Sequence, residues 1–130
     1  LDVLLGGTAP VVVCTARGIE AMRLPRRWHA PLTAGRLLVA SGFAPRLRRP
    51  TRELAAERNR HVAALSQRVL VAHAAPGGKT HRLAAERLRA GARVHTIDDP
   101  ANADLLLLGA LPIDAARAAA LCAGLAPERA

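Results

Sequence analysis

The residues of this chain that could do chemistry gather in one stretch, which runs from Glu57 to Thr80. Within it, the glycine pair Gly77-Gly78 precedes Lys79 and Thr80 at the start of an expected helix. Glycine lets a backbone approach a ligand closely, and the free amides at a helix start attract anions. Lys79 adds a point charge and Thr80 a hydroxyl, so this segment predicts a phosphate-binding loop.

Further cationic and amide side chains precede this loop along the chain. Arg58, Asn59 and Arg60 lie late in an expected helix, where adjacent residues point about 100° apart, so only one or two of them can face a cleft. A basic loop after the second expected strand adds Arg46, Arg48 and Arg49. An arginine loop beside a phosphate site is suited to tracking a polyanion. The alternatives are solvated surfaces of ordinary charge, and a tight turn at the glycines that binds nothing.

The composition favours an anionic partner. The chain has 130 residues and a net charge of +9. Residues 17–60 hold eleven arginines against three glutamates, whereas residues 61–130 carry a net charge of only +2. A basic half beside a nearly neutral half is typical of proteins that bind anions. Aromatic residues make up only 2% of the chain, so any nucleic acid would be held through its phosphates rather than by base stacking.

Apolar runs alternate with helical patterns along the chain. We expect strands over residues 10–15, 36–41, 68–74 and 92–97, and helices over residues 25–34, 51–66, 77–90 and 113–123. The continuous apolar run at 10–15 is typical of a strand covered on both faces. Residues 101–110 fit a fifth strand or a short helix, and Pro100 and Asn102 favour the helix. The alternation predicts an α/β fold: a Rossmann-like open parallel sheet of about four or five strands with helices on both faces. We expect one domain over residues 1–130.

Other kinds of site find little support. The two cysteines form no CxxC pair and the five histidines show no ligand spacing, so we expect no metal and no cofactor. The GxxxxGK[ST] motif is not met because residue 73 is His, and no serine–histidine–acid set can be assembled. No apolar run approaches the ~20 residues of a membrane span. The first seven residues are too short for a signal peptide, so we expect a cytoplasmic protein.

Several of these segments resemble the DprA/Smf family of DNA-processing proteins, which have a Rossmann-like domain of the SLOG superfamily. That family commonly reads RNRxxAxLS, an apolar strand, an SGS loop with a helix, a strand, and an asparagine-led segment ending in GA. The similar segments here are RNRHVAALS at 58–66, VLVAHA at 69–74, GGKTHRLAAERLRAG at 77–91, ARVHTI at 92–97 and NADLLLLGA at 102–110. The resemblance covers about residues 10–110, and RNRxxAxLS is its most specific part.

The chain also departs from the family pattern. GGK replaces SGS, so the loop gains charge. The family's first strands, with a GSR-like turn, would lie before residue 1, so the chain resembles the carboxyl-terminal half of such a domain or a short divergent member. ARGIE at 16–20 is similar to the family's SGxARGID turn, but its neighbours fit the following strand better. Half a sheet would expose an apolar edge strand, so we expect a missing segment or a partner chain to cover it.

The resemblance implies binding of single-stranded DNA in a basic pocket at the carboxyl ends of the strands, in DNA uptake and recombination. It further implies that the protein is not an enzyme, hands DNA to a recombinase and forms a homo-oligomer. By residue, it carries over to Arg58, Asn59 and the loop from Gly77 to Thr80.

Two other functions stay open from the sequence. The first is a nucleotide-binding or LOG-like phosphoribohydrolase module of the same superfamily. PGGKTHRLAAE at 76–86 loosely resembles the PGGxGTxxE motif of those enzymes, but it lacks the GT spacing and Glu86 comes late for the catalytic acid. The second is a domain that has lost its ligand and serves as an interaction module.

Overall fold

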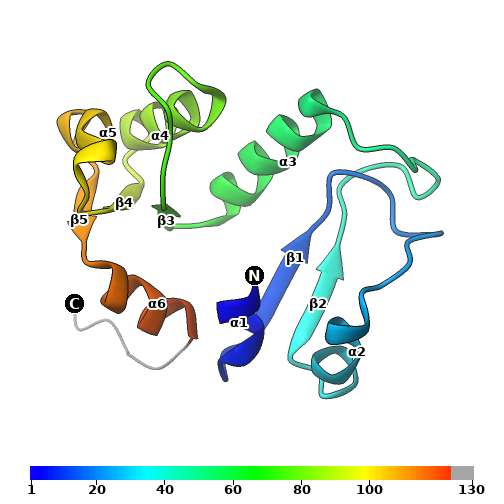
Figure 1. The fold of residues 1–130 in the computed structure, drawn as a ribbon. Helices are drawn as coiled ribbons and strands as arrows, with labels where there is room; N and C mark the ends of the chain where they lie inside the picture. The colour runs from blue at the N-terminus through cyan, green and yellow to red at the C-terminus, as the bar shows by residue number, and fades with distance from the viewer. Residues whose placement is uncertain (124–130) are drawn as a thin grey trace. The chain divides into compact units, whose positions relative to one another are not determined.

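A computed structural model describes residues 1–123 of the chain, which divide into two units with one sheet each (Figure 1). Unit 1 takes in Leu1–Arg58 and, of the described residues, 119–123; unit 2 is Asn59–Ala118. The boundaries between the units fall inside two helices.

Unit 1 is built on a pair of parallel strands. Its elements are α1 (Asp2–Gly6), β1 (Val11–Cys14), α2 (Arg26–Thr33), β2 (Leu37–Ala40), the first part of α3 (Arg52–Leu65) and the end of α6 (Ala115–Ala123). In the register of β1 and β2, Val11 lies opposite Leu37. The Thr51 hydroxyl accepts a hydrogen bond from the Leu54 amide at 3.2 Å, so Thr51 caps α3 as its residue type predicts.

The core of unit 1 lies on one face of its sheet. Val11, Trp28 and Leu37 are buried together, and partly buried side chains of α1, α2 and both strands pack around them. On the other face, Val12 and Leu38 are each 59% exposed. The expectation that residues 10–15 are covered on both faces is therefore wrong. Residues alternate between the two faces of a strand, and a continuous apolar run does not reveal which face is covered.

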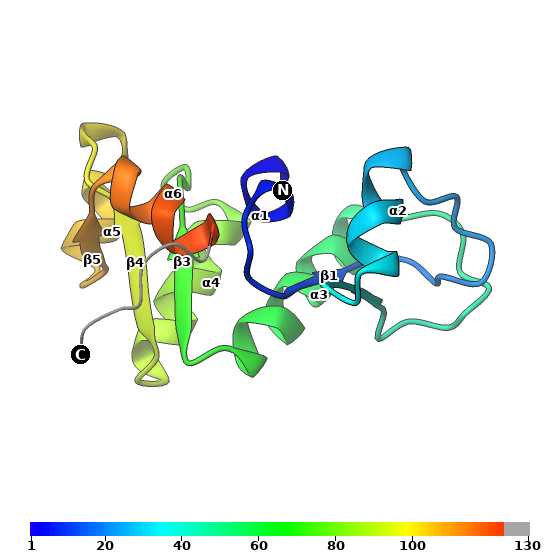
Figure 2. The same cartoon turned by 90° about the horizontal axis from the view of Figure 1, so that it is seen from below.

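Unit 2 holds a three-stranded parallel sheet in the order β3-β4-β5 (Figure 2). Its elements are the rest of α3, β3 (Arg68–Val71), α4 (Lys79–Arg89), β4 (Arg93–Ile97), the 3-10 turn η1 (Pro100–Asn102), α5 (Ala103–Leu107), β5 (Leu111–Ile113) and the start of α6. Helix α4 ends in a Schellman turn, because Gly91 has a φ of +78° and Ala92 donates to the carbonyl of Arg87 at 3.0 Å.

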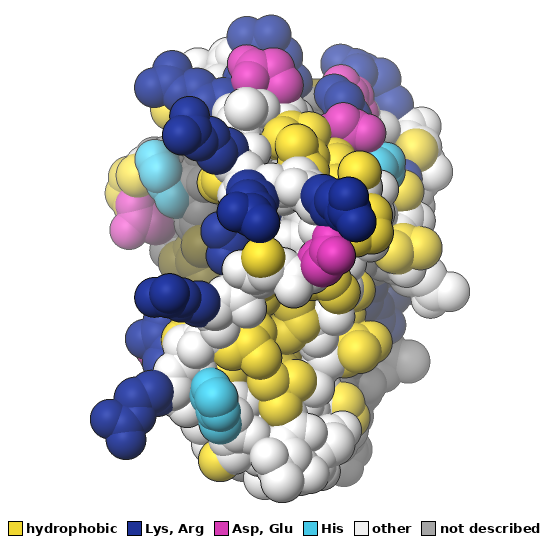
Figure 3. Space-filling view, turned by 90° about the vertical axis from the view of Figure 1, so that its right-hand side faces the viewer, with side chains coloured by type: hydrophobic (Ala, Val, Ile, Leu, Met, Phe, Trp, Pro, Cys, Tyr) yellow, Lys and Arg dark blue, Asp and Glu magenta, His cyan; other side chains and the backbone are white. Residues whose placement is uncertain are grey.

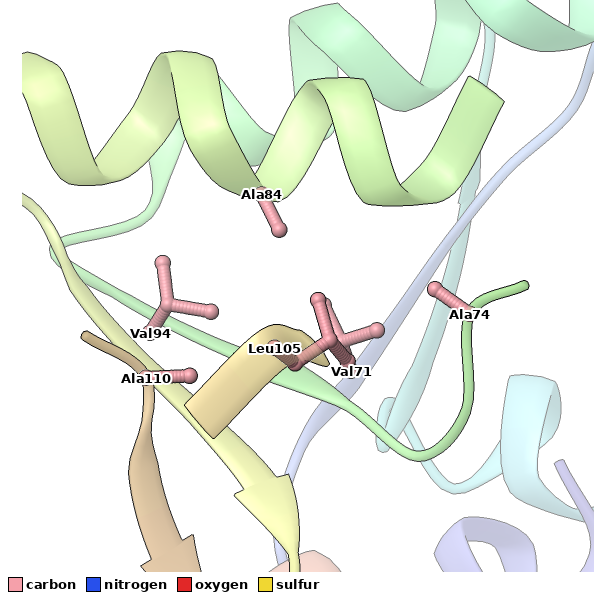
Figure 4. Close-up of a cluster of buried hydrophobic side chains, with 6 residues drawn as sticks. All are labelled: Val71, Ala74, Ala84, Val94, Leu105 and Ala110. Atoms are coloured by element: carbon pink, nitrogen blue, oxygen red, sulfur yellow. The ribbon is translucent and has the colours of Figure 1, made fainter. Parts of the chain in front are cut away.

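The core of unit 2 is made of small and branched aliphatic side chains between the sheet, α4 and α5. Figure 4 shows the cluster: Val71, Ala74, Ala84, Val94, Leu105 and Ala110. Val94 and Leu105 are fully buried. Thr96 is buried in the same layer, and its hydroxyl donates to the Val71 carbonyl at 2.8 Å. That bond satisfies the hydroxyl and ties β4 to β3.

The predicted α/β class with parallel strands is confirmed, but the predicted single sheet of four or five strands is not. The described residues form two sheets, of two and three strands. Residues 103–107 are helical, as Pro100 and Asn102 indicate. Strand β5 was not expected, and the last helix begins at Ala115 rather than at 113. Pro112 argues against a central strand, but β5 lies at the edge of its sheet, where a proline is tolerated. Within residues 1–123, no helix combines the length and the apolar character that crossing a membrane requires.

A pH dependence of stability is expected from His95 on β4. Burial, and then the positive charges of Arg68, Arg93 and Arg117, lower the pKa of His95 below 6.5. The unfolded chain therefore takes up a proton on this residue at a higher pH than the folded chain does. The contribution of His95 to the free energy of unfolding should be fully present above a pH of about 6.5, and it should be lost as the pH falls below that value. Urea unfolding between about pH 8 and pH 5 should show a smaller loss for His95→Gln than for the unchanged protein.

The matched control for this measurement is His29→Gln, because His29 is an exposed histidine of unit 1. That variant should keep the acid sensitivity of the unchanged protein. If the His95→Gln and His29→Gln variants lost stability equally, the assignment to His95 would be wrong.

Candidate phosphate-binding site

The glycine loop of unit 2 joins β3 to α4 and leaves the start of the helix open. Gly77 has a φ of +68°, in the region that favours glycine. The Gly78 amide donates to the Ala75 carbonyl at 3.0 Å, which closes the turn. Among the described residues, no side chain caps α4 at Gly78, and Lys79 and Thr80 are exposed. The amides of the first turn thus lack a side-chain acceptor at the positive end of the helix dipole.

Arg82 brings a second cation to this loop. Its Nε donates to the Gly77 carbonyl at 2.9 Å, so the side chain folds back along α4 toward the turn. Arg82 is not among the site residues predicted from the sequence. Its spacing is a signal for it, because Arg82 follows Gly78 by four residues and therefore shares its face of the helix.

Asn102 links the segment that follows β3 to the last residue of β4. Its side chain is 2% exposed, and its Nδ2 donates to the Ala72 carbonyl at 2.9 Å and the Ile97 carbonyl at 3.0 Å. Its Oδ1 lies 3.1 Å from Nδ1 of His73. An amide oxygen only accepts, so Nδ1 of His73 carries the proton in this contact. Asn102 thereby fixes the backbone at the carboxyl edge of the unit 2 sheet. One of the two carbonyls that it binds, that of Ala72, precedes the glycine loop by a few residues.

The carboxyl ends of β1 and β2 form a separate polar corner in unit 1. The Arg17 carbonyl accepts hydrogen bonds from the Thr15 hydroxyl at 2.7 Å and the Ser41 hydroxyl at 2.8 Å. Ser41 in turn accepts from the Phe43 amide at 3.1 Å. The Ser41 hydroxyl therefore joins the loop after β2 to the turn after β1, and the Thr15 hydroxyl stabilises that turn from within.

Gly18 lets the same two segments approach closely. Its amide donates to the Leu47 carbonyl at 2.8 Å. A Cβ at this position would lie 2.1 Å from the Pro45 carbonyl oxygen and 2.3 Å from that of Ala44. Only glycine fits here, which gives a physical reason for the glycine that ends the segment Ala16-Arg17-Gly18.

Three of the arginines proposed from the sequence, Arg46, Arg48 and Arg58, lie at this corner of unit 1. Arg58 donates from Nη1 to the Cys14 carbonyl, at the end of β1, at 2.7 Å. Arg46 pairs with Glu20 at 3.5 Å, and both side chains are largely exposed, so the pair adds little stability. Arg48 lines a hollow of about 440 Å³ together with Glu20, Ala21 and Arg46. The face seen in Figure 3 carries many Lys and Arg side chains with a few Asp and Glu side chains among them.

The candidate residues are divided between the units. Arg46, Arg48, Arg49 and Arg58 belong to unit 1, whereas Asn59, Arg60 and the 77–80 loop belong to unit 2. Asn59, Arg60 and Arg49 are exposed. Within residues 1–123, no group of three or more His, Cys, Asp or Glu side chains is placed to hold a metal ion. What the described corners offer a ligand is cationic side chains, hydroxyls and backbone amides.

Comparison with known proteins gives a fold likeness. No protein-family model matches the chain, and no curated protein matches it. Among solved structures, it is similar to the X-ray structure of DNA processing protein A (DprA) from Streptococcus pneumoniae, with a TM-score of 0.62, 19% sequence identity and 86% of this chain covered. The match covers 42% of the DprA chain. The fold of this chain is therefore that of part of DprA, as its sequence motifs predict.

Proposed function

We propose that this chain is a DprA-like module that binds single-stranded DNA through its phosphates, without catalysing a reaction on it, in DNA uptake and recombination. Residues 1–130 would form one DprA-type domain, associate with further copies and hand DNA to a recombinase. The observation that carries the proposal is the open start of α4, where Gly77, an uncapped first turn and exposed Lys79 lie together. The fold likeness to a DNA-processing protein supports the choice of DNA as the polyanion.

Each unit contributes groups suited to phosphate oxygens. In unit 2, the first-turn amides of α4 and the charges of Lys79 and Arg82 would hold one phosphate, with Thr80 as a hydroxyl donor. In unit 1, Arg46, Arg48 and Arg49 would bind further phosphates of the DNA backbone. Arg58 also positions the end of β1 through Cys14. Asn59 and Arg60 would add contacts from the exposed part of α3.

The few aromatic side chains fit phosphate binding better than base stacking. Trp28 is only 8% exposed and belongs to the core of unit 1. Phe43 is partly buried in the loop after β2. Base stacking on exposed aromatic rings contributes much of the affinity of other single-strand binders. Neither Trp28 nor Phe43 offers an exposed ring for such stacking.

The direct test removes the lysine of the glycine loop. Lys79→Ala should weaken binding of a fluorescein-labelled thymidine oligonucleotide about tenfold, because one charge-assisted hydrogen bond contributes about 1.4 kcal/mol or more. Fluorescence anisotropy at low salt measures this. The matched control is Arg89→Ala, which also removes one exposed positive charge, about 15 Å along the same helix. An equal loss of oligonucleotide affinity in both variants would mean that only the net charge of the protein matters. The glycine loop would then no longer be assigned as the phosphate-binding site.

A mononucleotide separates this proposal from the nucleotide-binding alternative. Thymidine monophosphate should compete with the labelled oligonucleotide only at a far higher concentration than an unlabelled oligonucleotide, because it offers one phosphate instead of a track. If thymidine monophosphate and the oligonucleotide competed equally well, the protein would be a nucleotide-binding module and not a DNA-binding one. If it released free adenine from adenosine monophosphate, it would be a LOG-like hydrolase.

A further inference from the structure

A second cationic feature of unit 2 lies at the opposite edge of its sheet. A groove of about 510 Å³ runs between the ends of α3 and α4 and the starts of β3 and β4. Three of its lining residues are arginines, namely Arg68, Arg87 and Arg93, and none of the described residues that line it is acidic. Its volume is in the range of small-molecule sites.

Two of the arginines are neighbours across the sheet. Arg68 and Arg93 are register partners at the first residues of β3 and β4, and both are exposed. Adjacent strands lie about 4.8 Å apart. An anion bound between them would be attracted by both guanidinium charges.

The third arginine comes from α4 and is partly buried. Arg87 donates from Nη2 to the Ser66 carbonyl at 3.4 Å, which holds its guanidinium against the groove. Among the described residues, its Nε is buried without an acceptor. Part of the donor capacity of this guanidinium is therefore unmet, and its charge is screened less by water than that of an exposed side chain.

The helix ends beside the groove do not reverse its sign. The carboxyl ends of α3 and α4 each bring roughly half a negative charge, against three full positive charges. The last carbonyls of α4 are also occupied, because Arg87, Leu88 and Glu86 accept from the amides of residues 92, 91 and 90. The lowered pKa of His95 fits the same positive surroundings, since Arg68 and Arg93 contribute to it after burial.

We propose that this groove is a second anion site, which binds a phosphate group between Arg68, Arg87 and Arg93. Guanidinium groups match phosphate oxygens with paired N–H donors, which favours phosphate over a simple halide. The site is separate from the glycine loop, because about 13 Å of strand lies between the amino and carboxyl edges of the sheet. It goes beyond the proposed function, which uses the carboxyl edge, and it stands or falls independently of that function.

The test follows the groove directly by NMR on the uniformly ¹⁵N-labelled full chain. Inorganic pyrophosphate, thymidine monophosphate and a thymidine oligonucleotide are titrated separately at constant ionic strength. At least one should produce saturable shifts of the Gly91 and Gln67 amides and of the Arg87 Nε–H signal. Shifts with pyrophosphate or the monophosphate identify a small phosphate ligand, whereas shifts with the oligonucleotide alone identify a phosphodiester. Absence of groove shifts with all three overturns the proposal.

Variants then assign the binding to the arginines. Arg68→Ser with Arg93→Ser should weaken the ligand that shifts the groove signals by tenfold or more, in line with about 0.7 kcal/mol or more for each charge. Arg89→Ser, an exposed arginine of the same helix outside the groove, should leave its affinity within about twofold. Lys79→Ala should also leave the groove shifts unchanged, even if it abolishes binding at the carboxyl edge.

If the double variant loses its fold, Arg93→Ser alone replaces it, with an expected loss of affinity of about threefold. Unchanged affinity in the folded variant, or a groove response that depends on Lys79, contradicts the proposal.

Discussion

Oligonucleotide binding is expected to weaken on the order of 300-fold when the salt concentration rises from about 50 to about 200 mM. Six phosphates are proposed to be neutralised, one by Lys79 together with Arg82 and one each by Arg46, Arg48, Arg49, Arg58 and Arg60. For single-stranded nucleic acid, each neutralised phosphate contributes about 0.7 to the slope of log affinity against log salt, so six contacts give a slope of about −4. Anisotropy titrations at four or five salt concentrations measure that slope.

The slope also discriminates between the candidate ligands. A single mononucleotide at the glycine loop engages one or two of these cations, and its affinity should fall less than about tenfold over the same range. The Lys79→Ala variant should make the slope for the oligonucleotide less steep by about 0.7, whereas Arg89→Ala should leave the slope unchanged. A slope near −1 for the unchanged protein would be incompatible with a track of arginines.

The local elements around the glycine loop could be predicted from the sequence because their signals are local. Gly77 and Gly78 mark the start of α4, Gly91 marks its end, and an apolar run marks β3. Turn chemistry and hydrophobic runs act within a few residues, so a single sequence reveals them. The fold likeness to DprA is consistent with the order in which these segments follow one another.

The contacts that shape the two corners depend on residues far apart in the chain, and the sequence does not reveal them. Asn102 binds the carbonyls of Ala72 and Ile97, and the first of these is 30 residues away. The division of the strands into two sheets is likewise a matter of pairing, which hydrophobic patterning leaves undetermined. From the sequence, Asn102 indicates a helix start and leads the NADLLLLGA segment, whereas its burial shows that its side chain also has a structural role.

The role of Arg58 shows a different limit. RNRxxAxLS predicts that Arg58 faces a ligand, and the structure places its guanidinium on the Cys14 carbonyl at the end of β1. An arginine has five N–H donors, so one guanidinium can in general bind both a backbone carbonyl and a phosphate. A sequence motif indicates that a guanidinium is needed at a position, but whether it binds backbone or ligand depends on the strand end that it reaches.

Gly18→Ala is expected to be among the most destabilising single substitutions in unit 1. The added Cβ would lie 2.1 Å from the Pro45 carbonyl oxygen and 2.4 Å from the Pro45 carbonyl carbon. Backbone atoms cannot rotate away as a flexible side chain would, so the turn at 16–18 and the loop at 44–47 must separate. We expect a loss of about 3 kcal/mol or more in the free energy of unfolding, at or above the upper end of ordinary overpacking. Urea unfolding followed by circular dichroism measures this loss.

The consequence for binding follows from the position of that loop. The 44–47 loop leads directly into Arg48, and Arg46 lies within it, so a displaced loop carries both cations away from the end of β1. Folded Gly18→Ala protein, examined at low temperature, should therefore bind the oligonucleotide more weakly than the unchanged protein. The control is Gly6→Ala, because a Cβ at Gly6 meets no described atom within 4 Å and its φ is not positive. That variant should stay within about 0.5 kcal/mol of the unchanged protein. If Gly18→Ala were as stable as Gly6→Ala, the close approach of the two segments would be wrong, and with it the placement of the arginine loop at the end of β1.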